Sequence, residues 1–315
     1  MDRIQIEIDH FLLYCESRNL KRKTLVSYEQ ALRMFADYLR REFDIRTAAA
    51  IRPNHVRSYV KHLRERGTYS LSPEMKRRGD ANKPLSDTTI GNYVRYIKIF
   101  LKFLYEEGEI QTDITKRIEN IKPKRKQRRL LSEQELKQFF DAFDTFTFWG
   151  RRDWTICRLL LDTGMRIGEC LALKPEDIDL RNKTIIVRNT KNGHERAVYF
   201  SDKMARELRR WFQYKERYLD SPYVFPTIRG TQLKVNNFER SLREVGKRVG
   251  IKVQPHLFRS LFAKYYLLNG GDWFTLSRIL GHSSVKVTQE AYLDFTNEEV
   301  GRKYTRHSPL SALDV

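Results

Sequence analysis

Residues 184–200, TIIVRNTKNGHERAVYF, contain the strand pattern that decides the fold class of the chain's second half. Residues 184–188 and 195–200 are rich in Ile, Val, Tyr and Phe, which favour the extended backbone of a sheet. The segment between them includes Asn192-Gly193, a pair typical of hairpin turns. The stretch therefore predicts two antiparallel strands, and residues 178–180 are a candidate third strand.

Helical patterns flank this hairpin on both sides. Upstream, Ser132 and Glu135 form a capping box that predicts a helix start. Downstream, one apolar stripe at helical spacing comprises Phe238, Leu242, Val245 and Val249. Pro255 suits the first turn of the next helix, which is expected to end at Asn269. Residues 131–315 are therefore predicted to be mainly α, with a small antiparallel β-sheet.

The first 120 residues show helical patterns only. The first of their apolar stripes comprises Leu25, Tyr28, Leu32, Phe35 and Leu39. Thr24 is predicted to cap this helix, Pro53 to lie in the first turn of the second, and Ser86 to cap the third. Because no residues here have catalytic spacing, residues 1–120 are predicted to form a helical binding module.

Positive charge is concentrated between these two halves. The 315 residues include 60 Lys and Arg against 40 Asp and Glu, a net charge of +20. Residues 121–130, IKPKRKQRRL, carry +6 of this charge, against +6 on residues 1–120 and +8 on residues 131–315. Such an excess favours a polyanionic partner, nucleic acid before a membrane surface.

The basic segment contains Pro123 and no apolar periodicity, which is typical of an extended linker between domains. One interpretation is a solvated hinge, and the other is a strap along DNA phosphates. The flanking domains favour the strap, in which the DNA-binding residues are Lys122, Lys124, Arg125, Lys126, Arg128 and Arg129.

Composition excludes several other classes of protein. Hydrophobic residues make up 40% of the chain, too many for a disordered polycation. No run of about 18 apolar residues predicts a membrane span, and the N-terminus lacks a signal-peptide pattern. Three cysteines without metal or disulfide spacing favour a reducing compartment. We therefore expect a cytoplasmic, nucleoid-associated protein without a membrane partner.

Three segments carry residues that are suited to chemistry. They are TGMRIGE at 163–169, PHLFR at 255–259, and LGHSS at 280–284 followed by Tyr292. Arg166 and Glu169 share a helix face at i, i+3 spacing, where the carboxylate can hold the guanidinium. His256 and Arg259 have the same spacing, and two cationic donors on one face suit a phosphate oxygen. Taken singly, each has an ordinary explanation, such as a surface ion pair, a capping histidine or a core tyrosine.

Taken together, these residue types occur in a distinctive order. The order is Arg166, Lys191 in the hairpin segment, His256, Arg259, His282 and Tyr292. Over about residues 1–300 the chain resembles the tyrosine recombinase (phage integrase-like) family, which often has a histidine at the position of Ser260. The resemblance implies a two-domain, C-shaped DNA clamp. Its parts would be a helical core DNA-binding (SAM-like) domain at 1–120, the basic linker at 121–130, and a catalytic domain with a C-terminal tail at 131–315.

The resemblance also implies how DNA would be cut. Arg166 and Arg259 would clamp the scissile phosphate, with a hydrogen bond from His282, and Glu169 would orient Arg166. Guanidinium groups suit this task because they stay charged at any working pH. No zinc spacing, Walker A loop or acidic metal cluster is visible in the sequence, so no cofactor is expected.

The same resemblance assigns the covalent and proton-transfer steps. Tyr292 would attack the phosphate to give a 3′-phosphotyrosyl link and a free 5′-hydroxyl. His256 would accept the tyrosine proton, and Lys191 would protonate the leaving oxygen. The phosphotyrosyl bond retains the energy of the phosphodiester, so rejoining would need neither metal nor ATP.

These residues predict a site-specific DNA recombinase that acts in integration, excision or resolution. The family implies a tetramer on two double-stranded DNA sites, with a Holliday junction intermediate. Residues 293–315 would then either dock onto a neighbouring subunit or form a flexible tail. The alternatives are a type IB-like DNA-relaxing topoisomerase and an inactive DNA-binding relative. The helical module argues against the topoisomerase, and the complete set of six residues argues against the inactive relative. The sequence leaves three roles open for a recombinase: mobile-element integrase, transposon recombinase and chromosome-dimer resolvase.

Overall fold

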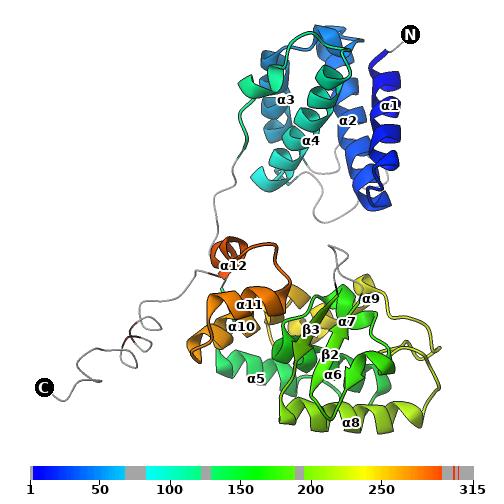
Figure 1. Ribbon diagram of the computed structural model, residues 1–315, viewed down its shortest axis with the longest axis vertical. Helices are drawn as coiled ribbons and strands as arrows, with labels where there is room; N and C mark the ends of the chain where they lie inside the picture. The colour runs from blue at the N-terminus through cyan, green and yellow to red at the C-terminus, as the bar shows by residue number, and fades with distance from the viewer. Residues whose placement is uncertain are drawn as a thin grey trace, which may run out of the picture. The chain divides into compact units, whose positions relative to one another are not determined.

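A computed structural model describes residues 3–67, 83–121, 129–188 and 195–292, together with residues 301 and 304. The chain divides into two compact units, Met1–Lys126 and Gln127–Val315 (Figure 1). The division falls inside the basic segment 121–130, of which residues 122–128 lie outside the described residues. None of the described helices is both long and apolar enough to cross a membrane.

The first unit is helical in its described part. Its α-helices are α1 (Arg3–Ser17), α2 (Arg22–Phe43), α3 (Pro53–Glu65) and α4 (Asp87–Glu106), and two short 3-10 helices are η1 (Ala48–Ala50) and η3 (Ile114–Arg117). Their apolar faces meet in one core that includes Phe11, Phe35, Tyr59 and Phe100. Ser86 caps α4 as predicted, since its hydroxyl accepts a hydrogen bond from the Thr89 amide at 3.2 Å.

The predicted cap at Thr24 is wrong. Helix α2 begins at Arg22 with Lys21 at the cap position, three residues before Thr24, and the Thr24 amide donates to the Lys21 carbonyl at 2.7 Å. Lys21 makes no side-chain capping bond, so the start of α2 is fixed by its backbone and not by a polar cap. A search for capping side chains cannot find such a helix start.

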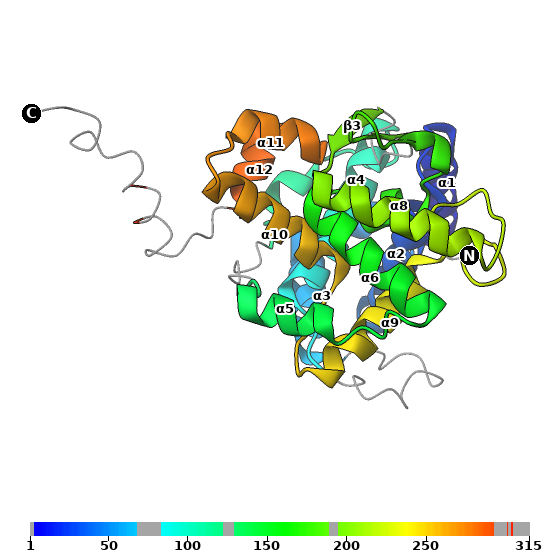
Figure 2. The ribbon, with the colours of Figure 1, turned by 90° about the horizontal axis from the view of Figure 1, so that it is seen from below.

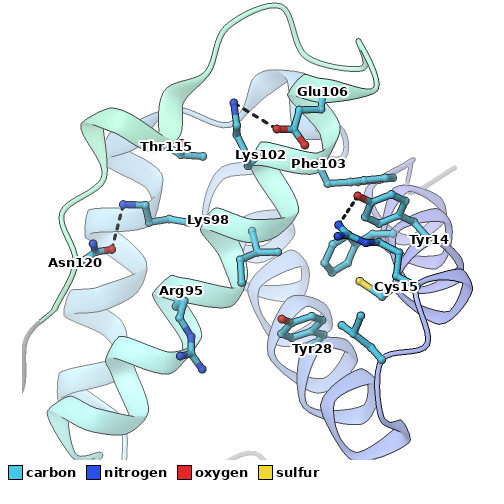
Figure 3. A pocket seen from close by; sticks show the side chains of 14 residues that line it. Tyr14, Cys15, Tyr28, Arg95, Lys98, Lys102, Phe103, Glu106, Thr115 and Asn120 are labelled. Atoms are coloured by element: carbon cyan, nitrogen blue, oxygen red, sulfur yellow. Dashed lines mark hydrogen bonds and ion pairs between the residues drawn. The ribbon is translucent and has the colours of Figure 1, made fainter. Parts of the chain in front are cut away.

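The first unit contains a cavity of about 610 Å³ between α1, α2 and α4 (Figure 3). Aromatic and basic side chains line it, and the basic ones have partners within the unit. Lys98 donates to the Ile118 carbonyl at 2.8 Å and to the Asn120 side chain at 3.1 Å. Arg18 donates to the Tyr14 hydroxyl at 2.9 Å, so these cations serve the packing of the unit.

The second unit is mainly α with a three-stranded sheet, as the sequence predicts. The strands are β1 (Ile178–Asp179), β2 (Thr184–Val187) and β3 (Arg196–Tyr199), in the order β1-β2-β3 and antiparallel throughout. The hairpin register pairs Ile185 with Val198, both fully buried. Residues 189–194, including the predicted turn and Lys191, lie outside the described residues.

The described part of the second unit consists mainly of helices. They are α5 (Glu133–Asp141), α6 (Phe148–Thr163), α7 (Ile167–Leu171), α8 (Asp202–Glu216), α9 (Val235–Arg248), α10 (Pro255–Leu268), α11 (Trp273–Leu280) and α12 (Val285–Tyr292), with the 3-10 helix η4 (Pro175–Asp177) before β1. Helix α6 contacts α8, α9 and α10, and α10, α11 and α12 lie together (Figure 2). The predicted capping box at the start of α5 is confirmed: Ser132 accepts from the Glu135 amide, and Glu135 accepts from the Ser132 amide.

The end of α6 places the segment that carries Arg166. Gly164 caps this helix in the left-handed conformation, with φ of +65°. A Cβ atom at this position would lie 2.3 Å from the ring of Phe262 on α10, so only glycine fits the turn. This close approach brings the segment that carries Arg166 against α10, which carries Arg259.

Candidate active site

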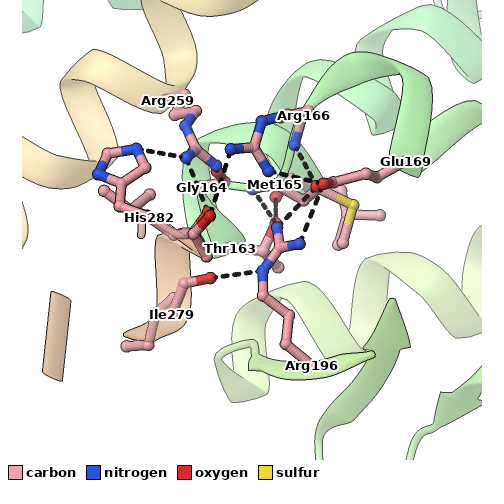
Figure 4. A network of polar contacts seen from close by, with 12 residues as sticks. Thr163, Gly164, Met165, Arg166, Glu169, Arg196, Arg259, Ile279 and His282 are labelled. Atoms are coloured by element: carbon pink, nitrogen blue, oxygen red, sulfur yellow. Dashed lines mark hydrogen bonds and ion pairs between the residues drawn. The ribbon is translucent and has the colours of Figure 1, made fainter. Parts of the chain in front are cut away.

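Arg166 and Glu169 form the predicted ion pair at the start of α7. The Arg166 amide donates to Glu169 Oε2 at 2.8 Å, and Arg166 Nη1 donates to Oε1 at 2.9 Å (Figure 4). The Glu169 side chain is only 3% exposed, whereas the Arg166 side chain is 34% exposed. The carboxylate is therefore a buried support for a guanidinium whose side chain is partly exposed.

Arg259 is buried beneath the end of α11. Its Nη1 donates to the Gly164 carbonyl at 2.7 Å, and its Nη2 donates to the Leu280 carbonyl at 2.8 Å. The same Nη2 lies 2.8 Å from His282 Nε2. These contacts join the turn after α6, the end of α11 and the predicted histidine around one guanidinium.

The contacts of His282 fix its tautomer. Arginine only donates, so His282 Nε2 must accept from Arg259. In the neutral ring the proton is then on Nδ1, which donates to Thr288 Oγ1 at 2.7 Å. Burial, together with the positive charges of Arg259, Arg166, Arg196 and His256, lowers the pKa of His282 to about 4. The imidazole is therefore neutral at pH 7 in the protein without DNA.

We expect the His282 imidazole to titrate near pH 4 in the free protein. Because this pKa lies below the unfolded value of about 6.5, the folded state binds fewer protons. The associated stability is fully present above about pH 6.5 and is lost as the pH falls towards 4. NMR titration of the ring, assigned with His282→Gln, measures this directly, and a midpoint at or above 6.5 would contradict the described contacts.

Arg196 on β3 belongs to the same network, although the sequence did not identify it as a site residue. Its Nη1 and Nη2 donate to Glu169 Oε1 and Oε2 at 3.0 and 2.6 Å, and its Nε donates to the Ile279 carbonyl at 2.9 Å. The available signal was its place five residues after Lys191, in the returning strand of the hairpin. Burial alone would raise the pKa of Glu169, but the hydrogen bonds from Arg196 and Arg166 hold it below its usual range.

The last carbonyls of α11 are shared among three arginines. Those of Ile279, Leu280 and Gly281 accept, in this order, from Arg196, Arg259 and Arg166, the last at 3.4 Å (Figure 4). A helix C-terminus carries partial negative charge, so it offsets the mutual repulsion of these cations. Arg196 thereby supports Arg166 and Arg259, whose guanidinium groups can stabilise an oxyanion such as a phosphate in a displacement reaction.

The structure places the remaining predicted residues only in part. His256 lies in the first turn of α10, and its side chain is exposed. Tyr292 is the last residue of α12, but its side chain lies outside the described residues, as does all of Lys191. Of the predicted linker contacts, Arg129 is described and donates to Glu135 at 2.7 Å. The other five predicted contacts lie outside the described residues: Lys122, Lys124, Arg125, Lys126 and Arg128.

The sequence matches two family models and many curated proteins. Residues 129–299 match the phage integrase family, and residues 8–75 match the phage integrase N-terminal SAM-like domain. Tyrosine recombinase XerA of Saccharolobus solfataricus is 31% identical over 285 residues, which cover 90% of this chain and 86% of that protein. Tyrosine recombinase XerC of Oceanobacillus iheyensis is 27% identical over 318 residues, which cover 98% of each chain.

Solved structures share the fold. A crystal structure of XerA recombinase matches over 97% of this chain and 99% of that chain, with 25% identity and a TM-score of 0.51. The Tn1549 transposon integrase in complex with transposon right end DNA gives a TM-score of 0.73 at 17% identity, over 95% of this chain and 98% of that chain. A lambda integrase tetramer bound to a Holliday junction gives 0.67 at 19% identity, over 89% and 77% of the two chains.

Proposed function

Because this chain belongs to the phage integrase family of tyrosine recombinases, we propose that it cuts and rejoins DNA at specific sites through a covalent 3′-phosphotyrosyl intermediate. The observation that carries the proposal is the convergence of Arg166, Arg259 and His282 at the end of α11. Their side chains come from three parts of the chain and meet around the turn at Gly281. Such a cluster stabilises the charge that develops on the equatorial oxygens of a phosphate under attack.

The chemistry then proceeds in two balanced steps. Tyr292 Oη attacks phosphorus, the bond to the 5′-oxygen breaks, and Lys191 gives that oxygen its proton. His256 takes the proton that Tyr292 loses. In the second step a 5′-hydroxyl of another strand attacks the phosphotyrosine and gives its proton to Lys191, while the bond to Tyr292 Oη breaks and His256 returns the proton to that oxygen. The number of phosphoester bonds is unchanged, so no energy source is needed.

His282 changes its role when the phosphate binds. Its pKa near 4 reflects burial and surrounding positive charge. A bound phosphodiester brings negative charge into this cluster, which raises the pKa and favours the protonated ring. A protonated His282 can donate to a phosphate oxygen, whereas in the free protein its Nε2 accepts from Arg259.

The alternative activity is relaxation of supercoiled DNA, which uses the same covalent step. Plasmids with one or two copies of the target site separate the two activities. A recombinase exchanges segments between two sites, and a topoisomerase relaxes the plasmid without exchange. Recombinant products from the two-site plasmid support the proposal, and relaxation without recombinants from either plasmid contradicts it.

The proposed assembly is a tetramer on two DNA sites in the cytoplasmic nucleoid, with residues 293–315 docked on a neighbouring subunit. The solved lambda integrase tetramer on a Holliday junction has the same fold. Sedimentation of the protein with site-bearing DNA measures the stoichiometry. Four protomers on two sites support the assembly, and one protomer per site at every concentration contradicts it.

We further propose that residues 1–120 and 131–315 close on DNA as a clamp, with the linker along the backbone. DNA affinity should then fall by about 10³–10⁵ between 50 and 200 mM salt if six to ten phosphates are contacted. Replacing the six linker cations by Gln should reduce the slope of log affinity against log salt by about 5. These cations are Lys122, Lys124, Arg125, Lys126, Arg128 and Arg129. If the replacements leave the slope unchanged, the linker cations do not contact DNA phosphates and the proposed role of the linker is wrong.

A further inference from the structure

We infer that Arg196 is a positioning residue for DNA cleavage, which keeps Arg166 in register with Arg259 and His282. It does so by holding two groups at once, the Glu169 carboxylate and the end of α11 (Figure 4). This inference rests on the proposed function, because the reaction it serves is attack on a phosphate. Arg196 itself touches neither the phosphate nor the nucleophile in this assignment.

The first support is the geometry at Glu169. Each carboxylate oxygen accepts one bond from Arg166 and one from Arg196, so the two arginines share the carboxylate evenly. The Arg196 side chain is 10% exposed, against 34% for Arg166. Arg196 therefore holds the carboxylate from the buried side, and the more exposed Arg166 has part of its guanidinium accessible to the substrate.

The second support is the contact of Arg196 with the turn that precedes His282. Its Nε donates to the Ile279 carbonyl at 2.9 Å. Gly281 has φ of +64°, and a Cβ atom there would lie 2.9 Å from Arg196 Cδ. The turn thus rests directly on the Arg196 side chain, and glycine is required both by the conformation and by this close packing.

Without Arg196, the Glu169 carboxylate and the end of α11 lose the side chain that binds both of them. The Glu169 carboxylate is nearly buried, so its remaining full charge partner would be Arg166, which would be drawn inward. The end of α11 would lose one of its three arginine contacts. A misplacement of about 1 Å between reacting groups costs about 100-fold in rate. Lysine cannot replace the planar fork that spans both carboxylate oxygens.

The test compares Arg196→Met and Arg196→Lys with a matched control, Arg188→Met. Arg188 lies on the other side of the same hairpin loop and is also ion-paired, with Asp177 at 2.7 Å, but its side chain is 54% exposed. Covalent cleavage of a nicked suicide substrate should fall about 100-fold for Arg196→Met and at least about 10-fold for Arg196→Lys. Arg188→Met should cleave within about 2-fold of the unmodified protein, since the ion pairs of Arg188 are with Asp177 and Glu195 and not with Glu169.

A second substrate separates positioning from a general loss of structure. A methylphosphonate at the scissile position lacks the negative charge that Arg166 stabilises, so a misplaced Arg166 should matter less. The deficit of Arg196→Met should shrink from about 100-fold to less than about 10-fold, as it should for Arg166→Ala. An equal deficit on both substrates, or cleavage of the phosphodiester at the normal rate, overturns the inference.

Failure of the proposed function gives a different result. In that case the unmodified protein itself forms no covalent adduct, whatever residue stands at position 196. If the unmodified protein forms the adduct and Arg196→Met forms it at the same rate, the function stands and only the role of Arg196 is wrong. DNA affinity measured on the same variants should stay within about 2-fold of normal, because Arg196 is not assigned to phosphate contact.

Discussion

Tyr292→Phe is expected to form no covalent adduct with a suicide DNA substrate and to cleave at least about 10⁴-fold more slowly than the unmodified protein. The change removes one oxygen, which is the proposed nucleophile. An enzyme without its nucleophile retains only the rate that its charge-stabilising groups give to water. Denaturing gels of protein with end-labelled DNA measure the adduct directly.

A second tyrosine provides the matched control for this variant. Tyr199 on β3 is 57% exposed, and Tyr199→Phe should form the adduct at the normal rate. Both variants should bind DNA with normal affinity, since neither changes a charge. An adduct that persists in Tyr292→Phe would assign the nucleophile to another residue and refute the central step of the proposed mechanism.

Arg259→Ala should show the second large effect, and on two quantities. Cleavage should fall by at least about 10³-fold, because the variant loses a charge-stabilising donor and the support of His282. The free energy of unfolding should fall by about 2–4 kcal/mol, because the carbonyls of Gly164 and Leu280 lose their partner. Urea unfolding and single-turnover cleavage measure the two effects on one preparation.

A surface arginine of the same unit serves as the control for Arg259→Ala. Arg210 on α8 pairs with Glu207, and its side chain is 64% exposed. Arg210→Ala should change neither stability by more than about 0.5 kcal/mol nor the cleavage rate. An Arg259→Ala protein with normal unfolding and normal cleavage would show that the described contacts do not hold the site together.

Local patterns were enough to predict most elements of the second unit. The hairpin strands, the capping box at Ser132 and the helix from Pro255 to Leu268 were all confirmed. Each depends on residues within a few positions of one another, through strand propensity, caps or fixed φ angles. Thr24 failed as a cap because α2 begins earlier, at Arg22, after Lys21, which makes no side-chain capping bond.

The site needed information that no local pattern contains. His256 and Arg259 do share the start of α10, yet His256 is exposed, whereas Arg259 is buried against the turns at Gly164 and Leu280. Arg196 lies 27 residues from Glu169 and 83 from Ile279 along the chain. Its role depends on how β3 packs against α7 and α11, which is a property of the folded unit.

The end of α11 has a consequence for how such a site can vary. Three successive carbonyls bind guanidiniums from α7, β3 and α10, so one short piece of backbone sets the spacing among all three. Substitutions that shift the last turn of α11 should carry the three cations along as a set. Helix α12, which ends at Tyr292, packs on α11. Such shifts would therefore change the position of the nucleophile relative to the phosphate, while the distances among the three arginines stay the same.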